Sequence, residues 1–259
     1  MTGTRDATSY FDGRSASYDA QYDARSPEGY ALRSRLAVVR RLVGPGPGEL
    51  LDAGMGPGRL VAELEAAGWD VSGIDASPAM VEEARRRAPG AGGRLLRAEI
   101  EALPFPNESF DAVVATGVLE YADVHRALDE LARVLRPGGI TVVSYPNPRA
   151  LYGIWKSGVH YPLVRALKRI GRRPEPWLPR GGPTIAPERF SAFLAETGLS
   201  VETVEPASYL VIPSPLDTVV APLSARVGEA LERRASSAAP VLATQVVYRS
   251  HKPQPDAVV

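Results

Sequence analysis

The chain has 259 residues, contains no cysteine, and balances 30 basic against 30 acidic residues. This length is sufficient for one large α/β domain or for one domain with an insertion. The absence of cysteine excludes disulfides, thiolate metal sites and cysteine nucleophiles, and the zero net charge argues against an electrostatic grip on nucleic acid. We therefore expect neither a metal ion nor a nucleic acid as a ligand.

No stretch approaches about 18 consecutive apolar residues, which a membrane-spanning helix would need. The N-terminus is polar and of mixed charge, without the apolar core of a signal peptide. These two features predict a chain without a transmembrane segment and with a cytoplasmic location.

The N-terminal part, residues 1–43, is expected to form a helical cap on the rest of the chain. We expect residues 1–9 to be frayed. The aromatic–acidic pairs that follow either cover the mouth of a site or pack an N-terminal helix onto the core. Apolar residues at helical spacing predict a helix over residues 29–43. Four arginines lie mostly off its apolar stripe: Arg33, Arg35, Arg40 and Arg41.

Between residues 44 and 145, short apolar segments alternate with segments of helical pattern. The predicted strands cover residues 49–53, 69–74, 94–97, 110–115 and 140–145. The predicted helices cover residues 59–67, a segment that starts at 78, and residues 124–135, after which a Pro-Gly-Gly sequence is expected to end the helix. This alternation predicts right-handed βαβ units in a parallel sheet.

After residue 146 the regular alternation stops, although we still expect one domain over residues 1–252 with a loose tail at 253–259. Residues 149–183 and 213–240 are interpreted as irregular insertions on the acceptor side of a site. Helices are predicted within them over residues 161–170 and 223–234, and outside them over residues 187–197, with strands over 199–204 and 243–249. The first insertion carries a basic cluster that either meets a phosphate or carboxylate or forms a solvated face: Arg165, Lys168, Arg169, Arg172 and Arg173.

The most informative segment, residues 49–60, has the pattern of a strand, a glycine turn and a helix start. Its glycines stand at alternate positions: Gly54, Gly56 and Gly58. Glycines let a ligand approach the backbone, and free N–H groups at a helix start favour an anion. A dinucleotide fingerprint would need a glycine where Arg59 stands, so the spacing here is D-x-G-x-G-x-G, beginning with Asp52. A tight turn without a ligand is the alternative.

Further candidates stand where the predicted strands end, which is where open parallel sheets bind ligands. Asp75 follows the second strand, where a carboxylate can accept both hydroxyls of a ribose; the alternative is an acid at a helix start. Glu99 follows the third strand and could accept from an adenine amino group, with the Ile100 N–H donating to the ring; the alternative is a solvated loop acid. Thr116 follows the fourth strand.

Five sequence blocks occur in the order and spacing of a known family: LLDAGMGPGRL at 50–60, GIDAS at 73–77, EALPF at 101–105, SFD at 109–111 and RVLRPGG at 133–139. Together they resemble the ubiquinone-biosynthesis-like class I S-adenosylmethionine (SAM) methyltransferases, of methyltransferase type 11. The resemblance covers about residues 49–145. It implies an α/β, Rossmann-like sheet of seven strands in the order 3-2-1-4-5-7-6, with strand seven antiparallel and helices on both faces. It also implies SAM as the methyl donor.

The same resemblance implies roles for individual residues. The three glycines would face the methionine part of SAM, Asp75 the ribose, and Glu99 and Ile100 the adenine, although family members usually have aspartate where Glu99 stands. Tyr18 and Tyr22 match an aromatic N-terminal segment that often closes the cofactor pocket. The complete expected set is Tyr18, Tyr22, Asp52, Gly54, Gly56, Gly58, Asp75, Ala76, Met80, Glu99, Ile100 and Thr116.

We therefore expect in-line transfer of the SAM methyl group to an oxygen or nitrogen of a small-molecule acceptor, such as a secondary metabolite, a sugar derivative or a lipid-like compound. Positioning and exclusion of water can supply much of the rate. A hydroxyl or ammonium acceptor also needs a base, for which the candidates are His160 and Glu120; a surface histidine is the alternative for His160. Two other functions stay open: a non-catalytic SAM- or adenosylhomocysteine-binding partner protein, and an NAD-dependent oxidoreductase, against which Arg59 counts.

Overall fold

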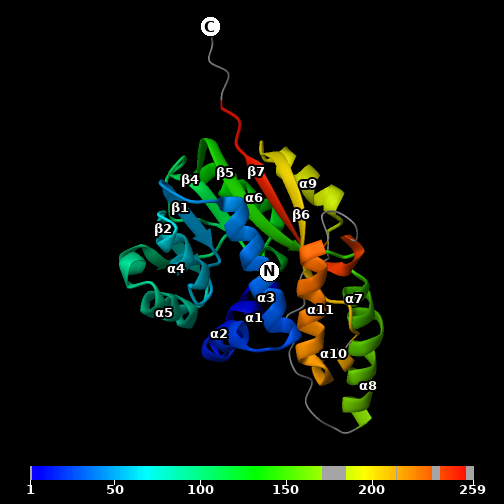
Figure 1. Cartoon of the computed structure of the whole chain (residues 1–259). Helices are drawn as coiled ribbons and strands as arrows, with labels where there is room; N and C mark the ends of the chain where they lie inside the picture. Colours follow the sequence, from blue (N-terminus) through cyan, green and yellow to red (C-terminus); the bar gives the residue numbers. More distant parts are fainter. Residues whose placement is uncertain (1, 171–184, 214, 235–239, 255–259) are drawn as a thin grey trace.

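The computed structural model describes residues 2–170, 185–213, 215–234 and 240–254 (Figure 1). Its centre is a seven-stranded sheet in the order β3-β2-β1-β4-β5-β7-β6. The strands are β1 (Glu49–Ala53), β2 (Asp70–Asp75), β3 (Leu95–Arg97), β4 (Phe110–Ala115), β5 (Leu135–Pro146), β6 (Ser200–Tyr209) and β7 (Ala243–His251). The neighbours from β3 to β5 pair in parallel, whereas β7 pairs antiparallel with both β5 and β6. This confirms the expected order and the antiparallel seventh strand.

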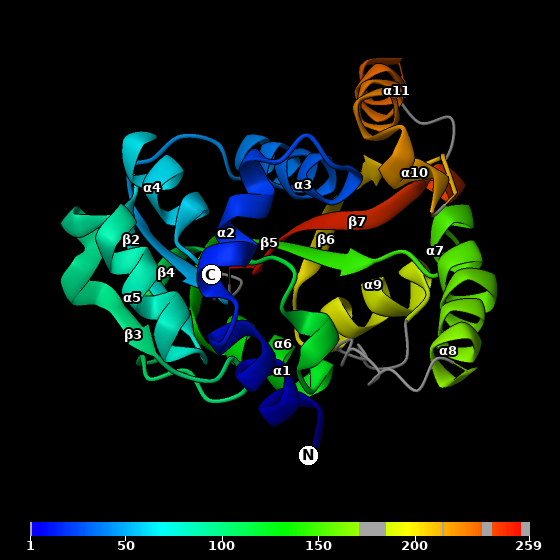
Figure 2. The same cartoon turned by 90° about the horizontal axis from the view of Figure 1, so that it is seen from below.

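Helices cover both faces of the sheet, as expected (Figure 2). They are α1 (Thr2–Asp12), α2 (Ser15–Asp23), α3 (Pro27–Val43), α4 (Arg59–Ala66), α5 (Pro78–Arg87), α6 (Val124–Val134), α7 (Leu151–Trp155), α8 (Tyr161–Ile170), α9 (Pro187–Glu196), α10 (Leu216–Val219) and α11 (Ala221–Arg234). Side chains of a strand alternate between its faces. Leu50 accordingly joins the core under α3, α4 and α5, and its neighbour Leu51 joins the core under α6 and α9.

The N-terminal residues are more ordered than the sequence suggested. Residues 1–9 were expected to be frayed, yet α1 begins at Thr2. The Asp12 carboxylate at the end of α1 accepts hydrogen bonds from the Ser77 hydroxyl at 2.9 Å and from the Ala79 N–H at 3.0 Å. Ser77 is also the N-cap of α5, where its hydroxyl accepts from the Met80 N–H. Contacts distant in sequence therefore hold α1 in place.

Two further differences concern the second half of the chain. The strand expected at 140–145 begins at Leu135. The Pro-Gly-Gly sequence that was expected to end the preceding helix therefore lies inside β5, where the pairing of β5 with β4 shifts its register. The first insertion contains more helix than predicted: α7, a π-helical turn over Lys156–His160 and α8 follow one another without a break. The remainder of that insertion, including the basic residues Arg172 and Arg173, lies outside the described residues.

Candidate cofactor and acceptor site

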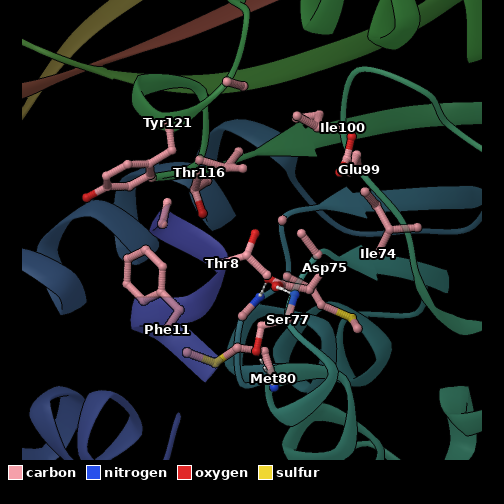
Figure 3. A pocket seen from close by; sticks show the side chains of 18 of the residues that line it. Thr8, Phe11, Ile74, Asp75, Ser77, Met80, Glu99, Ile100, Thr116 and Tyr121 are labelled. Carbon is pink, nitrogen blue, oxygen red and sulfur yellow. Dashed lines mark hydrogen bonds between the residues drawn. The ribbon is translucent and has the colours of Figure 1, made fainter. Parts of the chain in front are cut away.

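A cavity of about 800 Å³, its open mouth included, lies where β1, β2, β3 and β4 end (Figure 3). The loops after these four strands form its floor and sides. Helices α1 and α2 of the N-terminal cap close it from the other side, through Ala7, Thr8, Phe11, Tyr18 and Tyr22. The cavity thus combines the strand-end loops that sequence analysis selected with a cap that comes from the start of the chain.

The cavity brings together ten of the twelve residues expected to bind the cofactor. These are Tyr18, Tyr22, Gly54, Gly56, Asp75, Ala76, Met80, Glu99, Ile100 and Thr116. The other two, Asp52 and Gly58, do not line it. Contact with the cofactor stays a prediction for all twelve residues.

The three glycines of the turn have left-handed backbones, with φ of 84° at Gly54, 54° at Gly56 and 75° at Gly58. A Cβ at Gly54 would lie 2.7 Å from the Cβ of Val118, and one at Gly58 would lie 2.7 Å from the Cα of Ala84 in α5. A Cβ at Gly56 would have no atom within 4 Å. Gly54 and Gly58 therefore permit close packing, whereas Gly56 borders open space in the cavity.

Asp75, the residue expected to bind the ribose, lines the cavity at the end of β2. Its Oδ2 accepts from the Gly56 N–H and its Oδ1 from the Ser77 N–H, both at 2.9 Å. Burial raises the pKa of this carboxyl, and the two hydrogen bonds act in the opposite direction. A carboxylate has about four lone-pair sites, so both oxygens can still accept from a ligand.

Asp52, at the end of β1, is a second acidic residue close to Asp75. Its side chain is buried, and within the described part of the chain its Oδ1 has no hydrogen-bond partner. Burial, with a smaller contribution from the charge of Asp75, raises the pKa of Asp52 to about 7. Asp52 is therefore a buried acid that is protonated in weakly acidic solution and costs stability when it ionises.

This raised pKa predicts a pH dependence of stability. Between 3.8, the usual pKa of an aspartate, and about 7, folded Asp52 holds a proton that the unfolded chain releases. The stabilisation from the neutral Asp52 carboxyl is complete below pH 3.8. It falls by about 1.4 kcal/mol per pH unit across the range and is lost once the pH has risen through 7. We expect Asp52→Asn to be more stable than the wild type at pH 8 and to differ little from it near pH 4. Urea unfolding across this range measures both, and parallel pH profiles of the two proteins would contradict the assignment.

An aromatic cluster forms one wall of the cavity. Phe11 of α1 meets Tyr18 of α2 and Tyr121 of the loop after β4, each edge to face with ring centroids 5.5 Å apart. In Figure 3, Phe11 and Tyr121 lie on the same side of the cavity as Thr116, opposite Glu99 and Ile100. Edge-to-face pairs of this kind are favourable beyond their buried area. The cap thus contributes an apolar surface close to the end of β4.

Ion pairs hold the cap over the cavity. Asp19 of α2 accepts from Arg59 of α4 at 2.7 Å and from Arg87 of α5 at 2.7 Å, and Arg59 also donates to Asp23. The guanidinium groups hold the pKa of Asp19 below its usual value despite partial burial. Arg59 stands where a dinucleotide fingerprint would have glycine, and in this structure its side chain joins α2 to α4.

Arg35 of α3 is a functional candidate that sequence analysis missed. It was placed mostly off the apolar stripe of its helix, yet its side chain is buried behind Gly117, where a Cβ would lie 2.8 Å from both Nη atoms. Its Nε has no hydrogen-bond partner among the described residues. Burial acts to lower the pKa of the guanidinium, but the neighbouring Tyr18, Tyr22 and Glu120 outweigh it, so the pKa is raised and the group stays charged.

The two candidate bases lie in different environments. Glu120 stands in the loop after β4, between the cavity residues Val118 and Tyr121, but does not itself line the cavity. Burial raises its pKa, and its Oε2 has no partner in the described part of the chain. His160 lies in the π-helical turn before α8, next to the Tyr161 ring, and does not line the cavity. No described residue of the two insertions lines it either.

Comparison with known proteins identifies the family. A family model described as a methyltransferase domain matches residues 51–143. A demethylmenaquinone methyltransferase of Thermus thermophilus is 36% identical over 185 residues, which cover 67% of this chain and 84% of that protein. The chain is a class I SAM-dependent methyltransferase. SAM is its cofactor, and the alternative of an NAD-dependent oxidoreductase is rejected.

One further relative and one solved structure align with different shares of this methyltransferase. A ubiquinone/menaquinone biosynthesis C-methyltransferase of Syntrophotalea carbinolica is 37% identical over 145 residues, or 53% of this chain and 61% of that protein. The crystal structure of a SAM-dependent methyltransferase of Thermotoga maritima, described as a possible histamine N-methyltransferase, aligns with a TM-score of 0.64 at 19% identity. That alignment covers 95% of this chain and 99% of the other, and it shows the shared fold.

Proposed function

We propose that this methyltransferase transfers the SAM methyl group by in-line displacement to a small, largely apolar acceptor. The observation that carries the proposal is one continuous cavity with two chemically different sides. Asp75 and the glycine turn form its polar side, and Phe11 and Tyr121 form its aromatic side. The polar side suits the nucleoside and amino-acid parts of the cofactor, and the aromatic side suits an apolar acceptor.

The polar groups of the site fit SAM. Asp75 would hold the ribose, and Glu99 with the backbone of Ile100 would hold the adenine. The buried cation of Arg35 has an unpartnered Nε among the described residues and stands directly behind a loop that lines the cavity. SAM ends in a carboxylate, and charge-assisted hydrogen bonds between guanidinium and carboxylate are strong. We therefore place the carboxylate of SAM on Arg35.

The chain has a limited chemical task in this reaction. SAM supplies a reactive methyl group on a sulfonium, so the protein must position the acceptor and exclude water. The cap does both, because Phe11 and Tyr18 close the cavity and the ion pairs of Asp19 keep α2 in place. Glu120 is the better placed of the two candidate bases, since its neighbours line the cavity and those of His160 do not. Burial raises the pKa of Glu120, which makes the carboxylate a stronger proton acceptor.

The proposal has two versions, which differ in whether the methylated atom of the acceptor is oxygen or nitrogen, or carbon. We expected oxygen or nitrogen from the sequence. A carbon acceptor is the second candidate, because one relative is named a demethylmenaquinone methyltransferase and another a C-methyltransferase. A demethylated quinone in its reduced form is thus the first compound to test, followed by simple phenols and by amines.

The experiment measures transfer of label from methyl-labelled SAM to each acceptor, and mass spectrometry and NMR of the product identify the methylated atom. We expect transfer to at least one apolar acceptor, with little transfer to polar amines. Binding of SAM without transfer to any acceptor would favour the non-catalytic SAM- or adenosylhomocysteine-binding protein instead.

The same assay tests the base. We expect Glu120→Gln to lower kcat by roughly a hundredfold for a hydroxyl or ammonium acceptor, because glutamine keeps the shape of the side chain but cannot accept the proton. The affinity for SAM should change by less than about threefold, since Glu120 is not assigned to the cofactor. His160→Gln is the matched comparison and should leave kcat unchanged. The reverse pattern in kcat would exchange the two assignments.

A further inference from the structure

Most of the large apolar side chains that are exposed in the described part of the chain lie on two helical segments. Nine of eleven lie between residues 151 and 163 or between residues 216 and 223. We call these nine residues the apolar surface: Leu151, Ile154, Trp155, Val159, Leu163, Leu216, Val219, Val220 and Leu223. Val219 is 77% exposed, more than any other large apolar residue in this group. Gathered apolar patches mark interaction sites, whereas isolated exposed apolar residues need no explanation.

The two segments are adjacent in space. The Tyr152 hydroxyl of α7 donates to the buried Asp217 carboxylate of α10 at 2.6 Å, which joins the two insertions. In Figures 1 and 2, α7 lies beside α10 and α8 continues from α7, at the end of the sheet where α1 and α2 also lie. The apolar surface therefore belongs to the end of the molecule that carries the cofactor cavity.

On each segment the exposed apolar residues follow the spacing of one helix face. In α10 and the start of α11 the positions are i, i+3, i+4 and i+7, from Leu216 to Leu223. In α7 and α8 the positions from Leu151 to Leu163 continue across the π-helical turn at Lys156–His160. π-Helical turns are rare in proteins, and those that occur often lie at functional sites. These helices thus present apolar faces outward, although a helix usually turns such a face to the core.

Charge favours one kind of occupant. The sequence of residues 151–170, which spans α7 and α8, has four Lys or Arg residues and no Asp or Glu. A second copy of the chain would bring the same cationic segment against itself in a symmetric interface. An anionic lipid bilayer offers an apolar interior for the exposed apolar side chains and a negatively charged surface for the basic residues. Helices that lie in a membrane interface combine Lys and Arg with Trp and Leu in this way.

We propose that the apolar surface binds this methyltransferase to the surface of an anionic lipid bilayer. Among the described residues no helix is long and apolar enough to cross a bilayer, so the helices would lie within the interface. An apolar acceptor dissolved in the lipid would then reach the protein at its cavity end. The docking itself goes beyond the proposed function and does not depend on which acceptor is methylated.

The test is sedimentation of the purified full-length chain with vesicles at 0.1 M salt, where electrostatic attraction reaches about 10 Å. We expect binding to vesicles of phosphatidylglycerol mixed with phosphatidylcholine, and at least about tenfold weaker binding to phosphatidylcholine alone. The double variant Leu163→Ser with Leu223→Ser should lower binding to the anionic vesicles by tenfold or more, because each leucine loses the free energy of leaving water. Val204→Ser changes an exposed apolar residue outside the surface and is the matched control.

Titration with SAM checks that each variant is folded, since none of these residues lines the cavity. The proposal is overturned if the wild type stays in solution with anionic vesicles, or if the control variant loses as much binding as the double variant. It is also overturned if sedimentation velocity shows a dimer that the double variant dissociates, because a second copy then covers the surface. Vesicle binding without methyl transfer would refute only the proposed function, and methyl transfer without vesicle binding would refute only the docking.

Discussion

Replacing Arg35 with methionine is expected to weaken the binding of SAM by about a hundredfold, the largest effect on cofactor affinity that the structure predicts. Truncating one partner of a buried, hydrogen-bonded charge pair costs about 2–5 kcal/mol, and we place the carboxylate of SAM on this guanidinium. Isothermal titration measures the loss directly. Arg40→Met is the matched control, because Arg40 stands on the same helix but is exposed and pairs with Glu63 at the surface.

The stability of Arg35→Met is measured separately from its affinity for SAM. Arg35 is a buried cation beside the buried carboxyl of Glu120, and removing one partner of a buried pair leaves the other charge uncompensated. We therefore expect the free energy of unfolding of Arg35→Met to be lower than that of the wild type without SAM, and binding of methylthioadenosine shows whether the variant keeps its folded site.

A ligand without the carboxylate sharpens the test. Methylthioadenosine has the nucleoside and sulfur of adenosylhomocysteine but no amino-acid part. Wild type should prefer adenosylhomocysteine strongly, and Arg35→Met should lose most of that preference while still binding methylthioadenosine. If the variant weakens both ligands equally, Arg35 supports the site only through its structure, and the carboxylate must bind elsewhere.

Asp75→Ala is expected to weaken SAM binding by more than tenfold. The carboxylate lines the cavity and can accept from both hydroxyls of a ribose, and each hydrogen bond to a charged group contributes about 1.5–3 kcal/mol. An unchanged affinity, measured by isothermal titration, would reject the role of Asp75.

Alanine at this position also removes the acceptors of the Gly56 and Ser77 N–H groups, so thermal stability is expected to fall. Asp75→Asn separates the two effects, because its amide keeps one carbonyl acceptor of the same size. We expect Asn to restore part of the stability, because one of the two N–H groups keeps an acceptor, but only a small part of the affinity. Recovery of the full affinity would mean that Asp75 shapes the loop and does not contact the ribose.

The regular part of the fold was predictable because its pattern is local. Strand and helix alternate between residues 44 and 145 with short turns, and a parallel sheet brings the ends of its strands to one edge. Glycines and acids that follow those strands, such as Gly56 and Asp75, were therefore predictable as neighbours from their positions alone. The order of the last two strands was inferred from the family resemblance, since no local pattern specifies how β7 enters between β5 and β6.

The N-terminal cap was not predictable in the same way. The first residues are mostly polar, and the sequence suggested fraying. The order of α1 depends on contacts with partners more than sixty residues away, between Asp12 and the start of α5. From the sequence, Arg59 was interpreted only as a departure from the dinucleotide-binding fingerprint. Its ion pair with Asp19 was not predictable, because it forms only after α2 folds over α4.

By itself, the sequence determined the sheet, the glycine turn and the row of acids at the strand ends, because each of these depends on residues close together in the chain. Only the tertiary structure decided that Arg35 is a buried cation behind Gly117, that the cap and not a described part of an insertion covers the cavity, and that the insertions turn apolar faces outward. These features depend on which distant segments meet, and a local sequence pattern does not specify whether a side chain or an apolar helix face ends up buried or exposed.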